Sequence, residues 1–403
     1  MRKQQFLCMT LISILLSSCS SVQQETLEAK PEVHTTKKVI KDEKIDKPQK
    51  DATLISNFDE VAPQIQSNSN VVLPLTIKKY DIERKTLEDE LIAPEYVTHN
   101  IIAFQSYVSK EDASRASIGL IDRKTKKYTK IRQASDEKFM NSLTGYKNKL
   151  YWVEFDKSEK DENHWTIWEY NLSNKKTNKM KSGVSRKKTD PPILSMAQGK
   201  LCWLEYEVVG ERTISKIISF DIEKNRESII STEELDESDE RDGIYFSSIK
   251  AVKEGYIVDV SIFDKRAKTK SYRISFYPIN GKEPIHIIDR DRVIDFTVDG
   301  DWFVWTEEGS VFVASLKEGK VKYKFDSASS TLTNDTPIIK DNYLFYRYAV
   351  NQIFVVDLST GKRKPITDNI TMTSKLFRSD SAISFGVDDS ENSPKTISMY
   401  VIE

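Results

Sequence analysis

The sequence predicts an all-β fold, namely a β-propeller of seven four-stranded blades. From Val71 onward, short apolar runs rich in Ile, Val, Tyr, Phe and Trp alternate with charged turns, and no window keeps a helical period. One strand-like run also recurs, with spacings of 49, 51, 55, 47, 40 and 39 residues. The runs start at Ile101, Leu150, Leu201, Tyr256, Phe303, Tyr343 and Ala382. Four strands in about 40–50 residues, repeated in this way, are typical of propeller blades.

The seventh unit predicts how the propeller closes. A single blade exposes two apolar faces, so it becomes stable only when neighbouring blades cover both. The last unit ends with Thr396–Ile402 and lacks an outer strand. Val71–Ile82 precedes the first complete unit and has no other partner, so we expect it to supply that strand. Residues 71–403 are therefore predicted to form one domain.

The first residues are typical of an export signal. Arg2 and Lys3 precede an apolar stretch, Phe6–Leu16, that is too short to span a bilayer. The stretch ends in Leu16-Ser17-Ser18-Cys19, which resembles the bacterial lipobox. The resemblance implies that residues 1–18 are a signal peptide, that Cys19 carries the lipid, and that the membrane is a partner. It places the protein in the cell envelope, on the extracytoplasmic side. The alternatives are an ordinary signal peptide with a chance cysteine, or an uncleaved anchor.

Residues 19–70 are predicted to be a disordered tether. Between Ser20 and Phe58 there are seven Lys and seven acidic residues, and no aromatic residue precedes Phe58. Such a segment cannot bury enough apolar surface to offset the entropy lost on ordering. A helical stalk, the alternative, would need an apolar stripe that this segment lacks.

Charge and cysteine content exclude several classes. The formal net charge is −1, and loss of Arg2 and Lys3 with the signal peptide leaves 59 bases against 62 acids, a net of −3. No strongly basic field is available overall, so we expect no nucleic acid partner. Of the three cysteines, Cys8 lies in the signal peptide and Cys19 is the lipid site. Cys202 remains alone and can form no internal disulfide.

The repeats resemble those of TolB-type and prolyl-oligopeptidase-type propellers. Val355-Val356-Asp357-Leu358-Ser359-Thr360-Gly361 is the local segment that matches best. The Ser-Pro-Asp-Gly turn of TolB repeats is missing, and Val298-Asp299-Gly300 is only a fragment of it. The resemblance implies the architecture over about Val71–Glu403, but no subfamily.

No motif predicts catalysis, a metal or a cofactor. His34, His99, His164 and His286 lie in different parts of the chain, and no pair has the spacing of metal ligands. Cys202 lies on a predicted strand, and we expect a buried, unreactive thiol. There is no Gly-x-Ser-x-Gly elbow and no phosphate-binding glycine loop. We therefore expect no catalytic residue and no enzyme.

Two features leave alternatives open. Glu154, Glu205 and Glu307 each follow two residues after a tryptophan, at Trp152, Trp203 and Trp305. These pairs favour packing between blades, with the glutamate at the wet end of the strand, over a ring of carboxylates and aromatics that binds a sugar. The acidic run Thr232–Asp242 favours a solvated loop over a calcium site.

Long polar connections predict where function lies. The segments Lys110–Ser114, Asp156–Asn163, Phe263–Lys270 and Asp388–Lys395, together with Thr232–Asp242, all fall at the same end of the blades. We expect this loop-rich face to bind a protein or cell-wall partner, because irregular polar loops often carry function. The alternative is a propeller enzyme that acts on a glycan or small molecule in the central channel.

Overall fold

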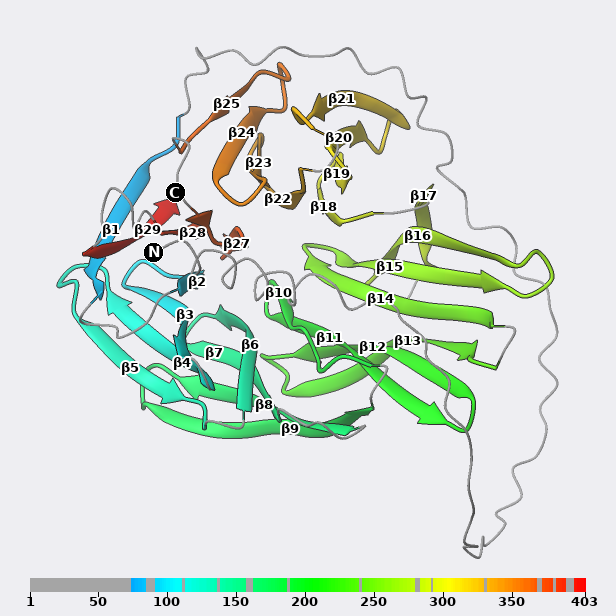
Figure 1. Cartoon of the computed structure of the whole chain (residues 1–403), viewed down its shortest axis with the longest axis horizontal. Helices are drawn as coiled ribbons and strands as arrows, with labels where there is room; N and C mark the ends of the chain where they lie inside the picture. Colours follow the sequence, from blue (N-terminus) through cyan, green and yellow to red (C-terminus); the bar gives the residue numbers. More distant parts are fainter. Residues whose placement is uncertain are drawn as a thin grey trace, which may run out of the picture. The chain divides into compact units, whose positions relative to one another are not determined.

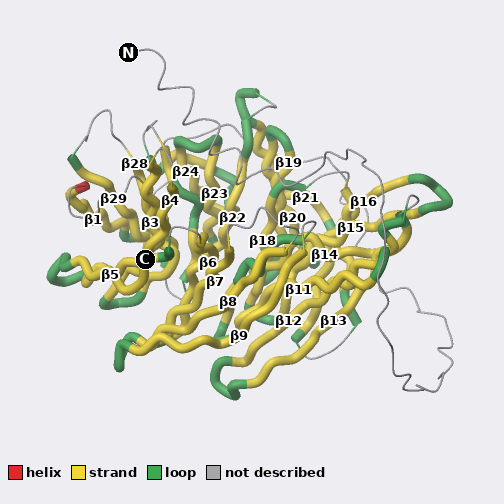
Figure 2. The backbone as a smooth tube through the Cα atoms, turned by 60° about the horizontal axis from the view of Figure 1, so that its bottom comes forward, coloured by secondary structure: helices red, strands yellow, loops and turns green. Residues whose placement is uncertain are grey.

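The computed structural model describes residues 74–84, 91–110, 113–135, 138–156, 162–186, 189–238, 241–279, 283–290, 293–329, 332–367, 372–379, 382–388 and 395–403. Every described residue belongs to one compact unit, Lys50–Glu403. The predicted signal peptide, Cys19 and the tether of residues 19–70 lie outside the described residues. Almost all of the described trace is strand or turn (Figure 2).

Six antiparallel sheets make up the described chain (Figure 1). Four of them have four strands each. They are β2 (Leu91–Val97), β3 (Ile101–Lys110), β4 (Ala113–Asp122) and β5 (Tyr128–Gln133); β6 (Lys138–Tyr146), β7 (Lys149–Asp156), β8 (Glu162–Asn171) and β9 (Lys176–Arg186); β18 (Asp295–Asp299), β19 (Trp302–Glu307), β20 (Ser310–Ser315) and β21 (Lys320–Asp326); and β22 (Asn334–Lys340), β23 (Tyr343–Tyr348), β24 (Gln352–Asp357) and β25 (Arg363–Pro365).

The remaining two sheets are larger. One has eight strands: β10 (Ser195–Ala197), β11 (Lys200–Val209), β12 (Arg212–Asp221), β13 (Arg226–Asp236), β14 (Asp242–Val252), β15 (Gly255–Asp264), β16 (Thr269–Pro278) and β17 (Ile285–Arg290). The other has five: β1 (Ile77–Glu83), β26 (Met372–Thr373), β27 (Phe377–Arg378), β28 (Ile383–Asp388) and β29 (Thr396–Ile402).

The fold is a β-propeller, as predicted. Each sheet contacts the next along the chain, and the last contacts the first through β2 and β28. The recurring apolar runs form the second strand of each unit. Their large side chains, such as Phe104, Trp152, Trp203, Phe303 and Phe345, are fully buried. Separate apolar cores fill the spaces between neighbouring units, because each unit has two faces to cover.

The N-terminal strand closes the propeller, which confirms the predicted closure. β1 pairs with β29 over seven residues, from Ile77 opposite Ile402 to Glu83 opposite Thr396. Tyr80 and Ile82 enter the same apolar core as Met399. The closing sheet thus combines the two ends of the described chain: β1 lies at one edge, β28 and β29 lie in the interior, and β26 and β27 pair with β28 at the other edge.

The acidic run differs from its prediction as a loop. Thr232–Asp236 forms the end of β13, because alternation continues there and places Leu235 in the interior opposite Thr213 of β12. Leu235 and Asp236 then pair with Gly243 and Asp242, which joins two predicted blades into one sheet. Gly243 has φ +124, and a Cβ there would lie 2.3 Å from the Glu234 carbonyl oxygen, so only glycine fits. Because of this joint, the count of seven blades stays a prediction.

The blades have two ends, which differ in the strand connections that they carry. At the turn face, the first strand of a unit turns into the second and the third into the fourth, as at Gly300 and Gly319. At the loop face, the second strand turns into the third and the fourth leads to the next unit, as at Gly309. No helix within the described ranges has the length and apolar character that a bilayer crossing requires.

Candidate functional site

The histidines and the cysteine that the sequence offered as candidates do not come together in one site. His99 and His164 are exposed on different units, His286 is half-buried on β17, and His34 lies outside the described residues. Among the described side chains, no group of three or more His, Cys, Asp or Glu could hold a metal ion. Cys202 is buried on β11, and burial raises the pKa of its thiol, so the thiol stays protonated. This agrees with the predicted buried thiol.

The tryptophan–glutamate pairs act between blades. In each pair the indole Nε1–H donates to the carboxylate two residues later: 3.1 Å from Trp152 to Glu154, 2.7 Å from Trp203 to Glu205 and 2.8 Å from Trp305 to Glu307. All three tryptophans are fully buried and their indole donors are already bonded, so they are not available to a sugar, which supports the packing alternative.

A cation from the outer strand of the preceding unit completes each pair. Arg132 on β5 donates two hydrogen bonds to Glu154, at 2.6 and 2.8 Å. Lys181 on β9 lies 2.6 Å from Glu205, and Arg290 on β17 lies 3.3 Å from Glu307. The wet position predicted for the glutamates is wrong for Glu154, whose side chain is only 2% exposed. Its charge is tolerated there because Arg132 neutralises it.

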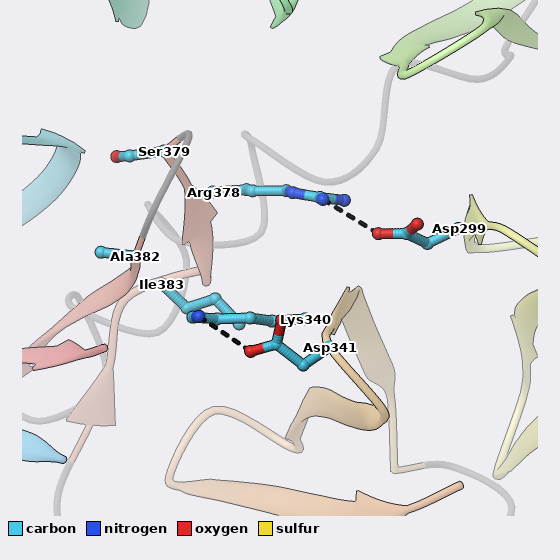
Figure 3. Close-up of a pocket in the computed structure, with 7 residues that line it drawn as sticks. All are labelled: Asp299, Lys340, Asp341, Arg378, Ser379, Ala382 and Ile383. Atoms are coloured by element: carbon cyan, nitrogen blue, oxygen red, sulfur yellow. Dashed lines mark hydrogen bonds and ion pairs between the residues drawn. The ribbon is translucent and has the colours of Figure 1, made fainter. Parts of the chain in front are cut away.

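A hollow of about 220 Å³ lies on the turn face, and Figure 3 shows the side chains that line it. It lies where β18, β22 and β27 end, so three units contribute to it. Arg378 forms an ion pair with Asp299 at 2.9 Å, and Lys340 forms one with Asp341 at 3.0 Å. Every charge drawn in this hollow is therefore neutralised by a neighbour. These residues are distant in sequence, and the sequence analysis did not identify them as a site.

A second hollow, of about 180 Å³, lies between β9 and β11 toward the loop face; we call it the β9–β11 groove. Its apolar lining comes from Trp165, Val184, Pro192, Leu204 and Tyr206. The Lys181–Glu205 ion pair lies at its wall. A glycine shapes this groove: a Cβ on Gly183 would lie 2.3 Å from the Trp165 ring, so the ring packs directly on the β9 backbone.

Exposed apolar side chains surround the β9–β11 groove. Val184 is 41% exposed, Ile193 is 62% exposed next to Pro192, and Val209 is 54% exposed at the tip of the β11–β12 hairpin. The Arg186 guanidinium donates to the Val208 carbonyl at 3.1 Å and so links the two hairpins at this point. Apolar side chains gathered beside a groove, rather than scattered singly, are typical of an interaction site.

One carboxyl group has an unusual environment. Asp259 lies on β15, and burial raises its pKa to about 7, an effect that the nearby Lys270 charge opposes. Its Oδ1 atom is buried with no hydrogen-bond partner among the described residues. A carboxyl group with a pKa near neutrality can donate or accept a proton at physiological pH, which is what general acid–base chemistry needs.

Comparisons with known proteins show the fold alone. No protein-family model matches the chain, and no curated protein matches it in sequence. The β-propeller domain of the Trilobed protease from Pyrococcus furiosus matches with a TM-score of 0.52 and 13% identity, over 75% of this chain and 91% of that one. The Pyrococcus horikoshii acylaminoacyl peptidase matches with a TM-score of 0.51 and 10% identity, over 74% of this chain and 49% of that one.

These likenesses agree with the architecture that the repeat resemblance implies. Both structures contain propeller domains of prolyl-oligopeptidase-type peptidases. The chain spans about half the length of the acylaminoacyl peptidase, and the match to this peptidase involves its propeller only. At such low identity, the peptidase activity of these proteins says nothing about the chemistry of this chain.

Proposed function

We propose that the chain is an envelope lipoprotein, anchored through Cys19 on the extracytoplasmic side, whose propeller is a binding module. Its partner is a protein that docks at the loop face. The observation that supports this most is the β9–β11 groove with exposed Val184, Ile193 and Val209 around it. The anchor rests on the lipobox resemblance at Leu16–Cys19.

The size and lining of the groove favour a protein over other partners. About 180 Å³ is below the ~300–1,000 Å³ of small-molecule pockets and suits one or two side chains of a partner. Apolar anchors beside a fixed ion pair are typical of the centre of protein interfaces. The other predicted partner class is a cell-wall glycan. A glycan offers mostly hydroxyl groups and would leave the side chains of Val184 and Val209 without apolar contacts.

Site-specific crosslinking tests this proposal. A photo-crosslinking residue in place of Val209 in the full chain is expected to form one discrete protein adduct in intact envelopes, because Val209 lies three residues beyond Tyr206 of the groove and follows Val208, which Arg186 of β9 contacts. Val350 is the matched control: it is 41% exposed, like Val184, and also lies at a second-to-third strand turn of the loop face. Equal adducts from Val209 and Val350, or none from Val209, would contradict docking at the groove.

A second candidate function is an enzyme that acts on a glycan or small molecule in the channel. Asp259 favours it, because its pKa of about 7 suits a general acid or base. The purified protein would be tested against envelope glycans and peptides. Turnover that Asp259→Asn abolishes without lowering thermal stability would establish this candidate and displace the binding module.

A further inference from the structure

Seven exposed lysines gather on two neighbouring blades. Four lie on the β4–β5 turn and β5, and three lie on the β8–β9 turn and β9. We call them the lysine patch: Lys124, Lys126, Lys127, Lys130, Lys175, Lys176 and Lys179. The two blades pack directly on each other, since Ile118 of one and Trp152 of the other share a core.

The sequence around the lysine patch contains no acid. Residues 123–135 carry six bases and no Asp or Glu, and residues 170–189 also have no Asp or Glu. The acids that directly precede the two runs already have partners: Asp122 accepts three hydrogen bonds within its own turn, and Glu169 pairs with Lys149. The next outer strand, β13, differs, with Glu227, Glu233, Glu234 and Asp236. The positive field is therefore local to two blades, although the whole chain is close to neutral.

The lysine patch lies on the face where the chain enters the propeller. β1 begins at Ile77 opposite Ile402, the turn-face end of β29. Arg123, which begins the lysine-rich turn, lies 2.7 Å from Glu403 and donates to the Tyr80 hydroxyl at 2.9 Å. The first described strand, β1, therefore begins beside the lysine patch.

We propose that the lysine patch lies against the anionic phospholipid headgroups of the membrane in which the chain is anchored. The patch is made of lysines on turns and strands, and neither hollow is lined by any of them. Flexible ammonium groups without a pocket suit a diffuse phosphate surface, whereas a specific phosphate ligand favours bidentate arginines. Each lysine near an anionic surface adds attraction that salt screens within a Debye length.

This contact would orient the whole propeller. With the turn face against the bilayer, the loop face and the β9–β11 groove point away from the membrane, toward the space where a partner arrives. The inference rests on the proposed anchoring through Cys19, which keeps the bilayer within reach.

Vesicle binding tests the inference with the chain from Ser20 onward, which contains every described residue and carries no lipid. At low salt it should co-sediment with vesicles of phosphatidylcholine mixed with phosphatidylglycerol, but not with phosphatidylcholine alone. The substitutions Lys124→Glu, Lys126→Glu and Lys127→Glu together should weaken binding at least about tenfold, and high salt should abolish it.

A matched control separates the patch from net charge. Lys265, Arg266 and Lys268 are exposed on the β15–β16 hairpin at the loop face, and their reversal to Glu changes the net charge by the same amount. Equal loss in both triple variants, or binding to neutral vesicles, would overturn the inference. Binding to soluble polyphosphate without vesicle binding would also overturn it, and would identify a polyanionic polymer as the partner class. The chain from Ser20 onward carries no lipid and is tested without a partner. A negative vesicle result would therefore overturn this inference alone, and the proposed function is tested separately by crosslinking.

Discussion

Single side chains carry the clearest energetic consequences. Asp259 has a folded-state pKa of about 7, raised above its ordinary value of 3.8 mainly by burial. Between these two values the folded state holds a proton that the unfolded chain releases, so stability is lost as the pH rises from about 4 to about 7. The charged form above pH 7 then carries the full cost of its burial.

Asp259→Asn removes this ionisation. We expect the variant to be more stable than the parent at pH 8, by about 2–4 kcal/mol, and to show little gain at pH 4. Urea unfolding at both pH values measures the difference. An unchanged pH dependence of stability in the variant would mean that Asp259 does not titrate in this range.

Glu154 is a second residue whose role depends on burial. Its side chain is almost fully buried and holds Arg132 through two hydrogen bonds, whereas the equivalent Glu307 is 29% exposed and lies 3.3 Å from Arg290. Since Arg132 is itself 36% exposed, solvent screening reduces the energy of its pair. Glu154→Gln should therefore cost about 2 kcal/mol in unfolding free energy, and Glu307→Gln about half as much or less. Equal costs would show that burial does not set the strength of these contacts.

The sequence predicts the tryptophan and the glutamate of each contact between blades, but not the cation. The Trp-x-Glu spacing is visible because both residues lie on one face of one strand. Arg132, Lys181 and Arg290 come from the preceding unit, and their positions depend on the register and bulges of outer strands, which alternation alone does not fix. For the same reason, the Asp299–Arg378 pair, 79 residues apart, could not be predicted.

At the scale of strands, the second strand of each unit was the most predictable element. Its continuous apolar run follows from burial on both faces, which also made the repeat visible. The end of β13 was wrongly predicted as a loop. Most of its residues are acidic, and Leu235 is the one buried residue of the strand, so the sequence shows no clear alternation there. The lysine patch could have been found from the acid-free runs at 123–135 and 170–189, but overall charge concealed it.

Closure by β1 gives a prediction at this scale. Deletion of residues 74–84 removes a seven-residue ladder with β29 and takes Tyr80 and Ile82 out of their core. Each buried side chain contributes about 1.5–3 kcal/mol, so the melting temperature of the whole domain should fall by about 10 °C or more. Deletion of residues 20–50, within the predicted tether, is the control and should leave the melting temperature unchanged. Similar melts for both deletions would contradict closure by β1.

At the scale of the whole molecule, the two faces have different chemistry. The turn face carries the lysine patch and the start of β1, while the loop face carries the β9–β11 groove with exposed Val184, Ile193 and Val209 near it. An anchored protein that must present a partner site benefits from this division, because a positive patch directed to the bilayer leaves the groove accessible.

Anchoring itself is tested at Cys19. A thioether-linked diacylglycerol and further acylation hold a protein far more firmly than lysine attraction, since each buried methylene contributes about 0.8 kcal/mol. Cys19→Ala should therefore abolish labelling by a palmitate analogue and release most of the protein from washed membranes, even with the lysine patch intact. Cys8→Ala is the matched control, because Cys8 lies in the predicted signal peptide and its loss should leave labelling unchanged. If Cys19→Ala is still labelled, the lipobox interpretation is wrong. If labelling is lost while the protein stays on membranes washed in high salt, an uncleaved N-terminal segment holds it instead, because salt removes only the electrostatic contact.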